Sequence, residues 1–84
     1  MRVAVTRSGG FAGMVRHAEI DSADHPAVAR LIQDVRLDEM PEPRAQPDRF
    51  VYEIEIGDRA AQVGEADLHG PLRDLVDEVM AHGA

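Results

Sequence analysis

Residues 2–7 alternate between apolar and polar positions, which is the pattern of a strand with one buried face. A glycine-rich segment at 8–13 interrupts this alternation, and a second, weaker strand is predicted at about residues 14–20. The inward positions of the two strands are Val3, Val5, Ala18 and Ile20. The chain therefore opens with two short strands and a glycine loop, as in a hairpin with an irregular connection.

The pattern then changes to helical spacing. Four apolar residues form one stripe: Val28, Leu31, Ile32 and Val35. Ser22 or Asp24 can cap the first turn, where Pro26 is tolerated because its missing N–H would have no partner there. We expect this helix to end near Leu37 and the proline-rich segment 38–48 to form a loop.

The most regular strand is predicted at 49–56, and a poorer return strand at about residues 59–65. Gly57 and Asp58 suit the tight turn between them, because glycine accepts a positive φ without steric cost. The inward apolar positions of this hairpin are Phe50, Tyr52, Ile54, Ile56, Ala61 and Val63.

A final helix is predicted to open at Pro71 and to stop at Gly83. Its apolar stripe begins just before the helix and comprises Leu68, Leu72, Leu75, Val76, Val79 and Met80. The element order is therefore ββαββα. Because hairpins favour antiparallel pairing and each helix needs an apolar sheet face to cover, we expect an α+β fold. Its single four-stranded antiparallel sheet carries both helices on one face.

The length of 84 residues indicates one domain, spanning 1–84, since a chain of this size buries only about 60% of its unfolded surface. The absence of cysteine excludes a disulfide, a thiolate zinc site and a thiol nucleophile. No apolar run approaches the ~20 residues of a membrane span, and the pattern of a signal peptide is missing. We therefore expect a cytoplasmic protein.

The net charge of the chain narrows the classes of partner that it could bind. Sixteen acidic and nine basic residues give a net charge of −7, which argues against nucleic acid and against an anionic membrane surface. The distribution is uneven, because residues 1–18 carry three arginines and no acid. All nine basic residues are arginine, and the chain contains no lysine.

The glycine-rich segment is the most informative motif, and it consists of Ser8, Gly9, Gly10, Phe11, Ala12 and Gly13. It lacks the lysine of a phosphate-binding loop, does not match GxGxxG and leads into a strand, so it is no phosphate cradle. No GxSxG surrounds Ser8, which excludes a nucleophile elbow. Two roles remain open. The segment is either a bulged hairpin whose Phe11 folds over the sheet edge, or a loop that presents Phe11 to a partner.

The sequence offers few other candidates for a metal-binding or catalytic site. The four histidines lie on different predicted elements without an i, i+4 pair, and they are His17, His25, His69 and His82. We therefore expect no bound metal and no cofactor. Nothing in the sequence assembles a nucleophile, a base and an orienting group, so we expect a protein that is not an enzyme.

At RSGGFAG, residues 7–13, the sequence resembles the emfourin family of proteinaceous inhibitors of protealysin and related thermolysin-like metallopeptidases. The segment PDRF at 47–50, followed by its alternating strand, resembles a second signature of the family. The leucine-rich final helix, which opens at Pro71, is similar as well. The resemblance covers essentially the whole chain in the same element order.

This resemblance implies a non-catalytic, cytoplasmic bacterial inhibitor that blocks the active-site cleft of a thermolysin-like (protealysin-like) metallopeptidase, with the zinc belonging to the peptidase. Two segments are candidates for entering the cleft, namely the glycine loop at 8–13 and the start of the first helix, with Asp24 and His25. A leucine tends to precede the helix-opening proline in the family, whereas this chain has His25. If that leucine is the inserted residue, either Phe11 takes its place or the pocket of the target differs. The alternative is a non-inhibitory interaction module or a small homodimer. The oligomeric state is left open.

Overall fold

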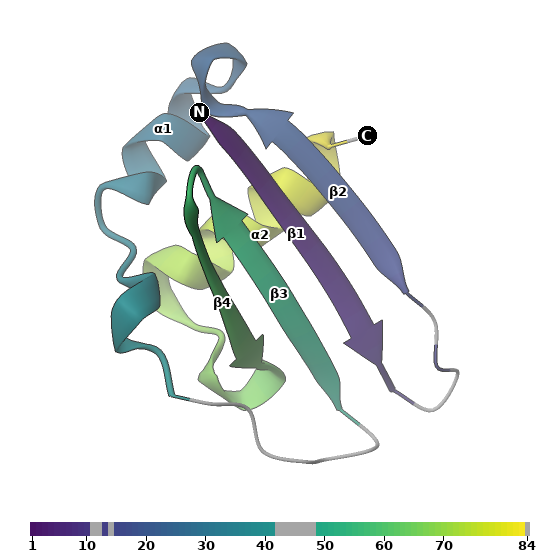
Figure 1. Ribbon diagram of the computed structural model, residues 1–84. Coiled ribbons are helices and arrows are strands. Elements are labelled where there is room, and N and C mark those ends of the chain that lie inside the picture. The colour runs from purple at the N-terminus through teal and green to yellow at the C-terminus, as the bar shows by residue number, and fades with distance from the viewer. Residues whose placement is uncertain (11–12, 14, 42–48, 84) are drawn as a thin grey trace.

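The computed structural model of the chain describes residues 1–10, 13, 15–41 and 49–83 (Figure 1). The four strands are β1 (Arg2–Gly9), β2 (Arg16–Asp21), β3 (Phe50–Ile56) and β4 (Arg59–Gly64). The two helices are α1 (Pro26–Ile32) and α2 (Gly70–His82). Short 3₁₀ turns occupy Ser22–Asp24, Leu37–Glu39 and Glu65–Asp67.

The strands form one antiparallel sheet in the order β2-β1-β3-β4. β1 lies inside the sheet, where Val5 pairs with Ala18 of β2 and with Ile54 of β3. Both helices lie behind the same face of the sheet (Figure 1). The predicted α+β fold and the order ββαββα are therefore confirmed.

The core lies between the sheet and the helices, and it consists mainly of the apolar residues that strand alternation and helical spacing predict to face inward. Ile54 and Leu75 are its largest fully enclosed side chains, both with an exposed fraction of 0%. The apolar stripe of α2 is buried as its spacing predicts, at Leu72, Leu75, Val76 and Val79. Gly57, at φ 62°, makes the predicted turn between β3 and β4.

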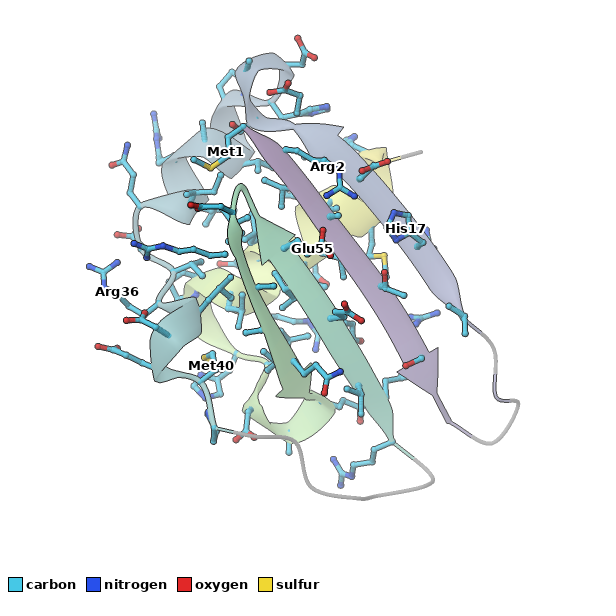
Figure 2. All side chains as sticks on the ribbon, in the orientation of Figure 1. Met1, Arg2, His17, Arg36, Met40 and Glu55 are labelled. Atoms are coloured by element: carbon cyan, nitrogen blue, oxygen red, sulfur yellow. The ribbon has the colours of Figure 1, made fainter. Side chains whose placement is uncertain are left out.

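The outer face of the sheet carries polar groups that pair across strands. Arg2 bridges the carboxylates of Glu19 and Glu55, with 2.7 Å between its Nη1 and Glu55 Oε2. Hydrogen bonds to Glu55 and Glu19 raise the pKa of Arg2. Figure 2 shows Arg2, Glu55 and His17 on this face, and the hydroxyl of Thr6 lies 2.7 Å from Nδ1 of His17.

The first helix is shorter than predicted, since it ends at Ile32 and not near Leu37. The chain after it tightens into i→i−3 bonds, such as the amide of Asp34 donating to the carbonyl of Leu31 at 3.0 Å. Val35 and Leu37 are both buried, with exposed fractions of 9% and 6%. Residues two apart lie about 200° apart around a helix, so a continuous helix would expose one of them.

The predicted cap of α1 is also wrong. Asp21 accepts a hydrogen bond from the amide of Ala23 at 2.9 Å and so caps the 3₁₀ turn, whereas α1 begins after His25 without a side-chain cap. The Ala23 amide, together with the N-terminal ammonium 3.0 Å away, holds the pKa of Asp21 below its usual value. Pro26 lies in the first turn of α1, as predicted.

Candidate partner-binding site

The glycine-rich segment begins as part of the sheet. Ser8 pairs with Val51 of β3 and Gly9 pairs with Phe50, so both residues belong to β1. The prediction that the loop starts at Ser8 is therefore wrong. The apolar alternation of the sequence stops at Arg7, but the strand continues because β3 provides pairing partners for the next two residues.

The end of β1 folds closely over the start of β3. Gly9 and Gly10 have φ angles of 100° and 74°. A Cβ on Gly9 would lie 2.7 Å from the carbonyl oxygen of Arg49, and one on Gly10 would lie 3.0 Å from the ring of Phe50. The amide of Gly10 donates to that same carbonyl at 3.3 Å. A side chain on Gly9 would therefore push the backbone of β1 away from Arg49, and one on Gly10 would displace the ring of Phe50.

The ring of Phe50 contacts both Arg7 and Gly10 at this end of the sheet. The guanidinium carbon of Arg7 lies 4.5 Å from the centroid of the Phe50 ring, within the range of a cation–π contact. Gly10 packs against the same ring. Arg7 and Phe50 therefore support the base of the glycine segment from two strands. The predicted inward position of Phe50 is confirmed, since its partly buried side chain packs against the core. Its contact with the glycine segment was not predicted, although the two family signatures that meet here, at 7–13 and 47–50, were a signal for it.

Phe11 and Ala12 lie outside the described residues, and so does Met14. On either side of them, the amide of Gly13 donates to the carbonyl of Gly10 at 3.3 Å. Val15 follows with an exposed fraction of 67%, a large apolar side chain open to solvent. The apolar pattern of the sequence gave no reason to single out Val15, and one exposed apolar side chain does not by itself mark a binding site.

Asp24 and His25 lie at the other end of the sheet (Figure 1). β2 separates them from the glycine segment, and its run from Arg16 to Asp21 spans about 17 Å at roughly 3.3 Å per residue. Asp24 is exposed in the 3₁₀ turn, while the ring centroid of His25 lies 5.9 Å from that of His82. The structure therefore does not bring the two candidate segments together.

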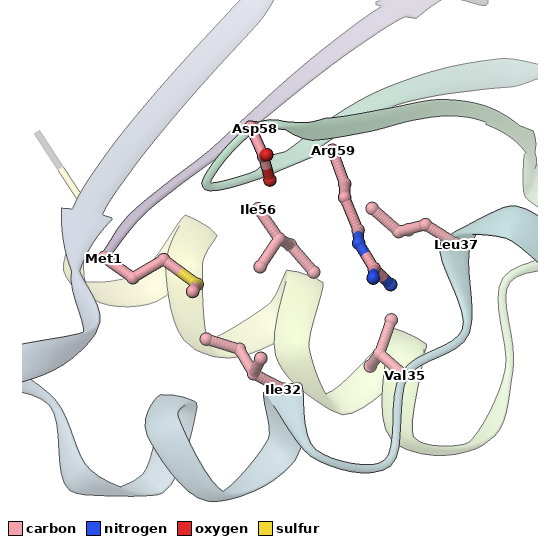
Figure 3. A pocket seen from close by; sticks show the side chains of 7 residues that line it. All are labelled: Met1, Ile32, Val35, Leu37, Ile56, Asp58 and Arg59. Atoms are coloured by element: carbon pink, nitrogen blue, oxygen red, sulfur yellow. The ribbon is translucent and has the colours of Figure 1, made fainter.

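A recess of about 300 Å³ also opens at the Asp24 end of the sheet. Figure 3 shows Ile32, Val35 and Ile56 on its walls, with Asp58 and Arg59 approaching from the β3–β4 turn. The recess opens mainly over apolar side chains of the core, and it lies at the end of the sheet opposite the glycine segment. Within 1–10, 13, 15–41 and 49–83, no three His, Asp or Glu side chains gather closely enough to hold a metal ion.

Comparison with known proteins adds one finding. The family model described as Emfourin matches residues 5–80, which include the glycine segment and all of β3. Neither a curated protein nor a solved structure matches the chain significantly. In the described part of the chain, neither helix is long and apolar enough to cross a membrane.

Proposed function

Because the chain belongs to the Emfourin family, we propose that it is a non-catalytic inhibitor of a thermolysin-like zinc metallopeptidase and that it blocks the active-site cleft. The observation that carries this proposal is the family match over residues 5–80. The match includes the RSGGFAG motif at 7–13, from which the resemblance to these inhibitors starts. In this proposal residues 1–84 act as one inhibitor domain, and the catalytic zinc belongs to the peptidase.

The geometry at the glycine segment supports cleft entry. A cleft admits a protruding turn more readily than a flat sheet face, and Gly9, Gly10 and Gly13 leave the backbone free of side-chain bulk. The base of the turn is held by Phe50 and by the hydrogen bond from Gly10 to Arg49. A fixed base reduces the conformational entropy that the segment has to lose on binding, which favours tight association.

Phe11 is the residue that we propose for insertion into an apolar pocket of the peptidase, with the glycines on either side allowing close approach to the enzyme main chain. Val15, exposed at the base of the turn, would add apolar contact at the rim of the cleft. Thermolysin-like enzymes favour a bulky apolar residue just after the scissile bond, and a phenylalanine satisfies that preference.

The test is a titration of a purified thermolysin-like peptidase with this protein, with hydrolysis of a short peptide substrate as the readout. We expect activity to fall with increasing protein and to reach a plateau near zero at excess. A serine peptidase under the same conditions serves as control and should retain its activity. Undiminished metallopeptidase activity at a large excess of protein, across several enzymes of the thermolysin class, would contradict the proposal.

A further inference from the structure

A second recess, of about 320 Å³, lies at the end of the sheet that carries the glycine segment. Arg7 and Arg16, which flank that segment on β1 and β2, line one side of it, and α2 contributes Arg73 and Asp77. Tyr52 of β3, which pairs with Arg7 in the sheet, also lines the recess. Three guanidinium groups thus share one recess with a single carboxylate, in a chain whose net charge is −7.

Arg7 and Arg16 are direct partners in the register of β1 and β2. Like charges directly opposite one another on a sheet are destabilising, so the pair needs compensation. Arg7 obtains it from the ring of Phe50, 4.5 Å away, and Nη2 of Arg16 donates to the carbonyl of Met80 at 2.9 Å. Within the described part of the chain, neither arginine forms an ion pair with a carboxylate.

The recess retains many hydrogen-bond donors. A guanidinium has five N–H groups, arranged so that two can meet both oxygens of one carboxylate. Arg16 donates to Met80, and Arg73 uses Nε for Asp77 at 3.3 Å. The remaining donors of the three arginines face no protein acceptor among the described residues. A single carboxylate would both accept hydrogen bonds from these donors and offset one of the two opposed positive charges.

We propose that this recess binds an acidic side chain of the target peptidase at the rim of its cleft while the glycine segment enters the cleft. The inference rests on the proposed inhibitory function and identifies the chemistry of the partner surface. Its basis is charge complementarity, together with position, since Arg7 directly precedes the segment and Arg16 follows it by three residues. A peptidase carboxylate beside the cleft would meet this recess in the same encounter.

The first test compares Arg16→Glu with Arg59→Glu. The two variants change net charge equally, but Arg59 lies in the recess at the opposite end of the sheet. We expect Arg16→Glu to raise the inhibition constant at least tenfold at about 50 mM salt, with a smaller effect at about 500 mM because salt screens partly exposed charges. Arg59→Glu should change it less than twofold. Thermal unfolding of both variants controls for loss of structure.

The second test uses the absence of lysine from the chain. Arg16→Lys introduces a single lysine amine into the recess, and a carbodiimide joins such an amine to a carboxylate in direct contact. We expect a cross-link between position 16 and an Asp or Glu of the peptidase in the inhibited complex. Peptide mass spectrometry separates it from any product of the amino terminus. Arg59→Lys is the matched control and should give none.

The outcomes separate the two proposals. If the wild-type protein does not inhibit any thermolysin-like peptidase, the proposed function fails and this inference fails with it. If the wild type inhibits but Arg16→Glu and Arg59→Glu behave alike, only the recess is overturned. An inhibited complex of Arg16→Lys that gives no cross-link at position 16 would also overturn it.

Discussion

Gly9 occupies a position that a residue with a Cβ cannot take without moving the neighbouring strand. The obstacle is the backbone carbonyl of Arg49, which, unlike a flexible side chain, cannot swing aside. Its φ of 100° adds a second restriction, because residues with side chains rarely adopt it. Gly13 also has a positive φ, of 61°, but no atom lies within 4 Å of where its Cβ would be. Both glycines therefore have a positive φ, but only Gly9 also lies against a neighbouring backbone atom.

We predict that Gly9→Ala lowers the free energy of unfolding by about 2–4 kcal/mol, the sum of positive-φ strain and an overpacked contact. Gly13→Ala is the matched control and should cost about 1–2 kcal/mol, since only the strain applies. Urea denaturation of the three proteins measures both values. Equal losses in the two variants would show that the contact with Arg49 does not limit this position.

Asp21 makes stability depend on pH at the low end of the scale. Its folded pKa lies below the unfolded value, first because of the Ala23 amide and then because of the N-terminal ammonium. A depressed aspartate pKa stabilises the fold above the unfolded value, near 4, and the benefit disappears as pH falls through the folded pKa.

We predict that wild type exceeds Asp21→Asn in stability by a constant amount above about pH 4, and that this difference shrinks below it. Asparagine keeps an oxygen that can accept from Ala23, so the comparison isolates the charge. Urea unfolding at a series of pH values from 6 to about 2.5 measures it. A difference that stays constant throughout would contradict the assignment.

At the scale of elements, the two helices contribute unequally to the core. α2 presents four buried residues to the sheet, whereas α1, at seven residues, buries only Val28 fully. A helix so short is marginal by itself and depends on tertiary contacts. Leu75 of α2 is completely enclosed, while Leu31 of α1 is only half-buried. The same substitution in both helices therefore measures the difference.

We predict that Leu75→Ala costs about 2–5 kcal/mol, because it leaves a cavity in the centre of the core. Leu31→Ala should cost about 1–2 kcal/mol, in proportion to its smaller buried area. Urea unfolding of the two variants gives the comparison. A larger loss at Leu31 than at Leu75 would mean that α1 and not α2 is the main cover of the sheet.

The elements that the sequence predicted well are those with one buried face. Alternation located all four strands to within about two residues, and helical spacing located α2. The predicted end of α1 was wrong because the apolar stripe of helical spacing extends past Ile32 to Val35. The burial of Leu37 together with Val35 excludes a continuous helix there. That burial depends on tertiary packing, which a local pattern does not contain.

The candidate site, too, could be predicted only in part from the sequence. The glycine segment stands out in the sequence, but the contacts of Arg7 with Phe50 and of Gly10 with Arg49 join parts of the chain far apart in order. The facing pair of Arg7 and Arg16 depends on hairpin register, which an irregular connection leaves undetermined. These features required the structure.

At the scale of the molecule, the two candidate binding segments are separated by the length of a strand. The glycine segment and the Asp24–His25 turn lie at opposite ends of β2 (Figure 1). One narrow cleft does not readily hold both, so a single end should dominate inhibition. The family signature, the exposed Val15 and the arginine recess all lie at the glycine end.

We predict that Phe11→Ala weakens inhibition at least tenfold, about 1.4 kcal/mol, with little change in melting temperature. Asp24→Ala and His25→Ala are the matched controls at the opposite end and should each change inhibition less than twofold. Inhibition assays paired with thermal unfolding measure both effects. Intact inhibition by Phe11→Ala with a large fall in melting temperature would assign Phe11 to the fold, and a loss in Asp24→Ala or His25→Ala would move the site.

The interior place of β1 in the sheet has a consequence for biosynthesis. β1 is made before the strands that flank it, and one of these two neighbours, β3, is separated from it by β2, α1 and the segment beyond. While the ribosome is still adding those residues, the nascent chain has only the β1–β2 hairpin, and isolated hairpins are marginally stable at best. Pairing between strands so distant in order is slow, because a long loop must close first. The sheet therefore closes only after β3 has been made, and until then the edge of β1 that β3 will cover is unpaired, the kind of edge at which strands aggregate.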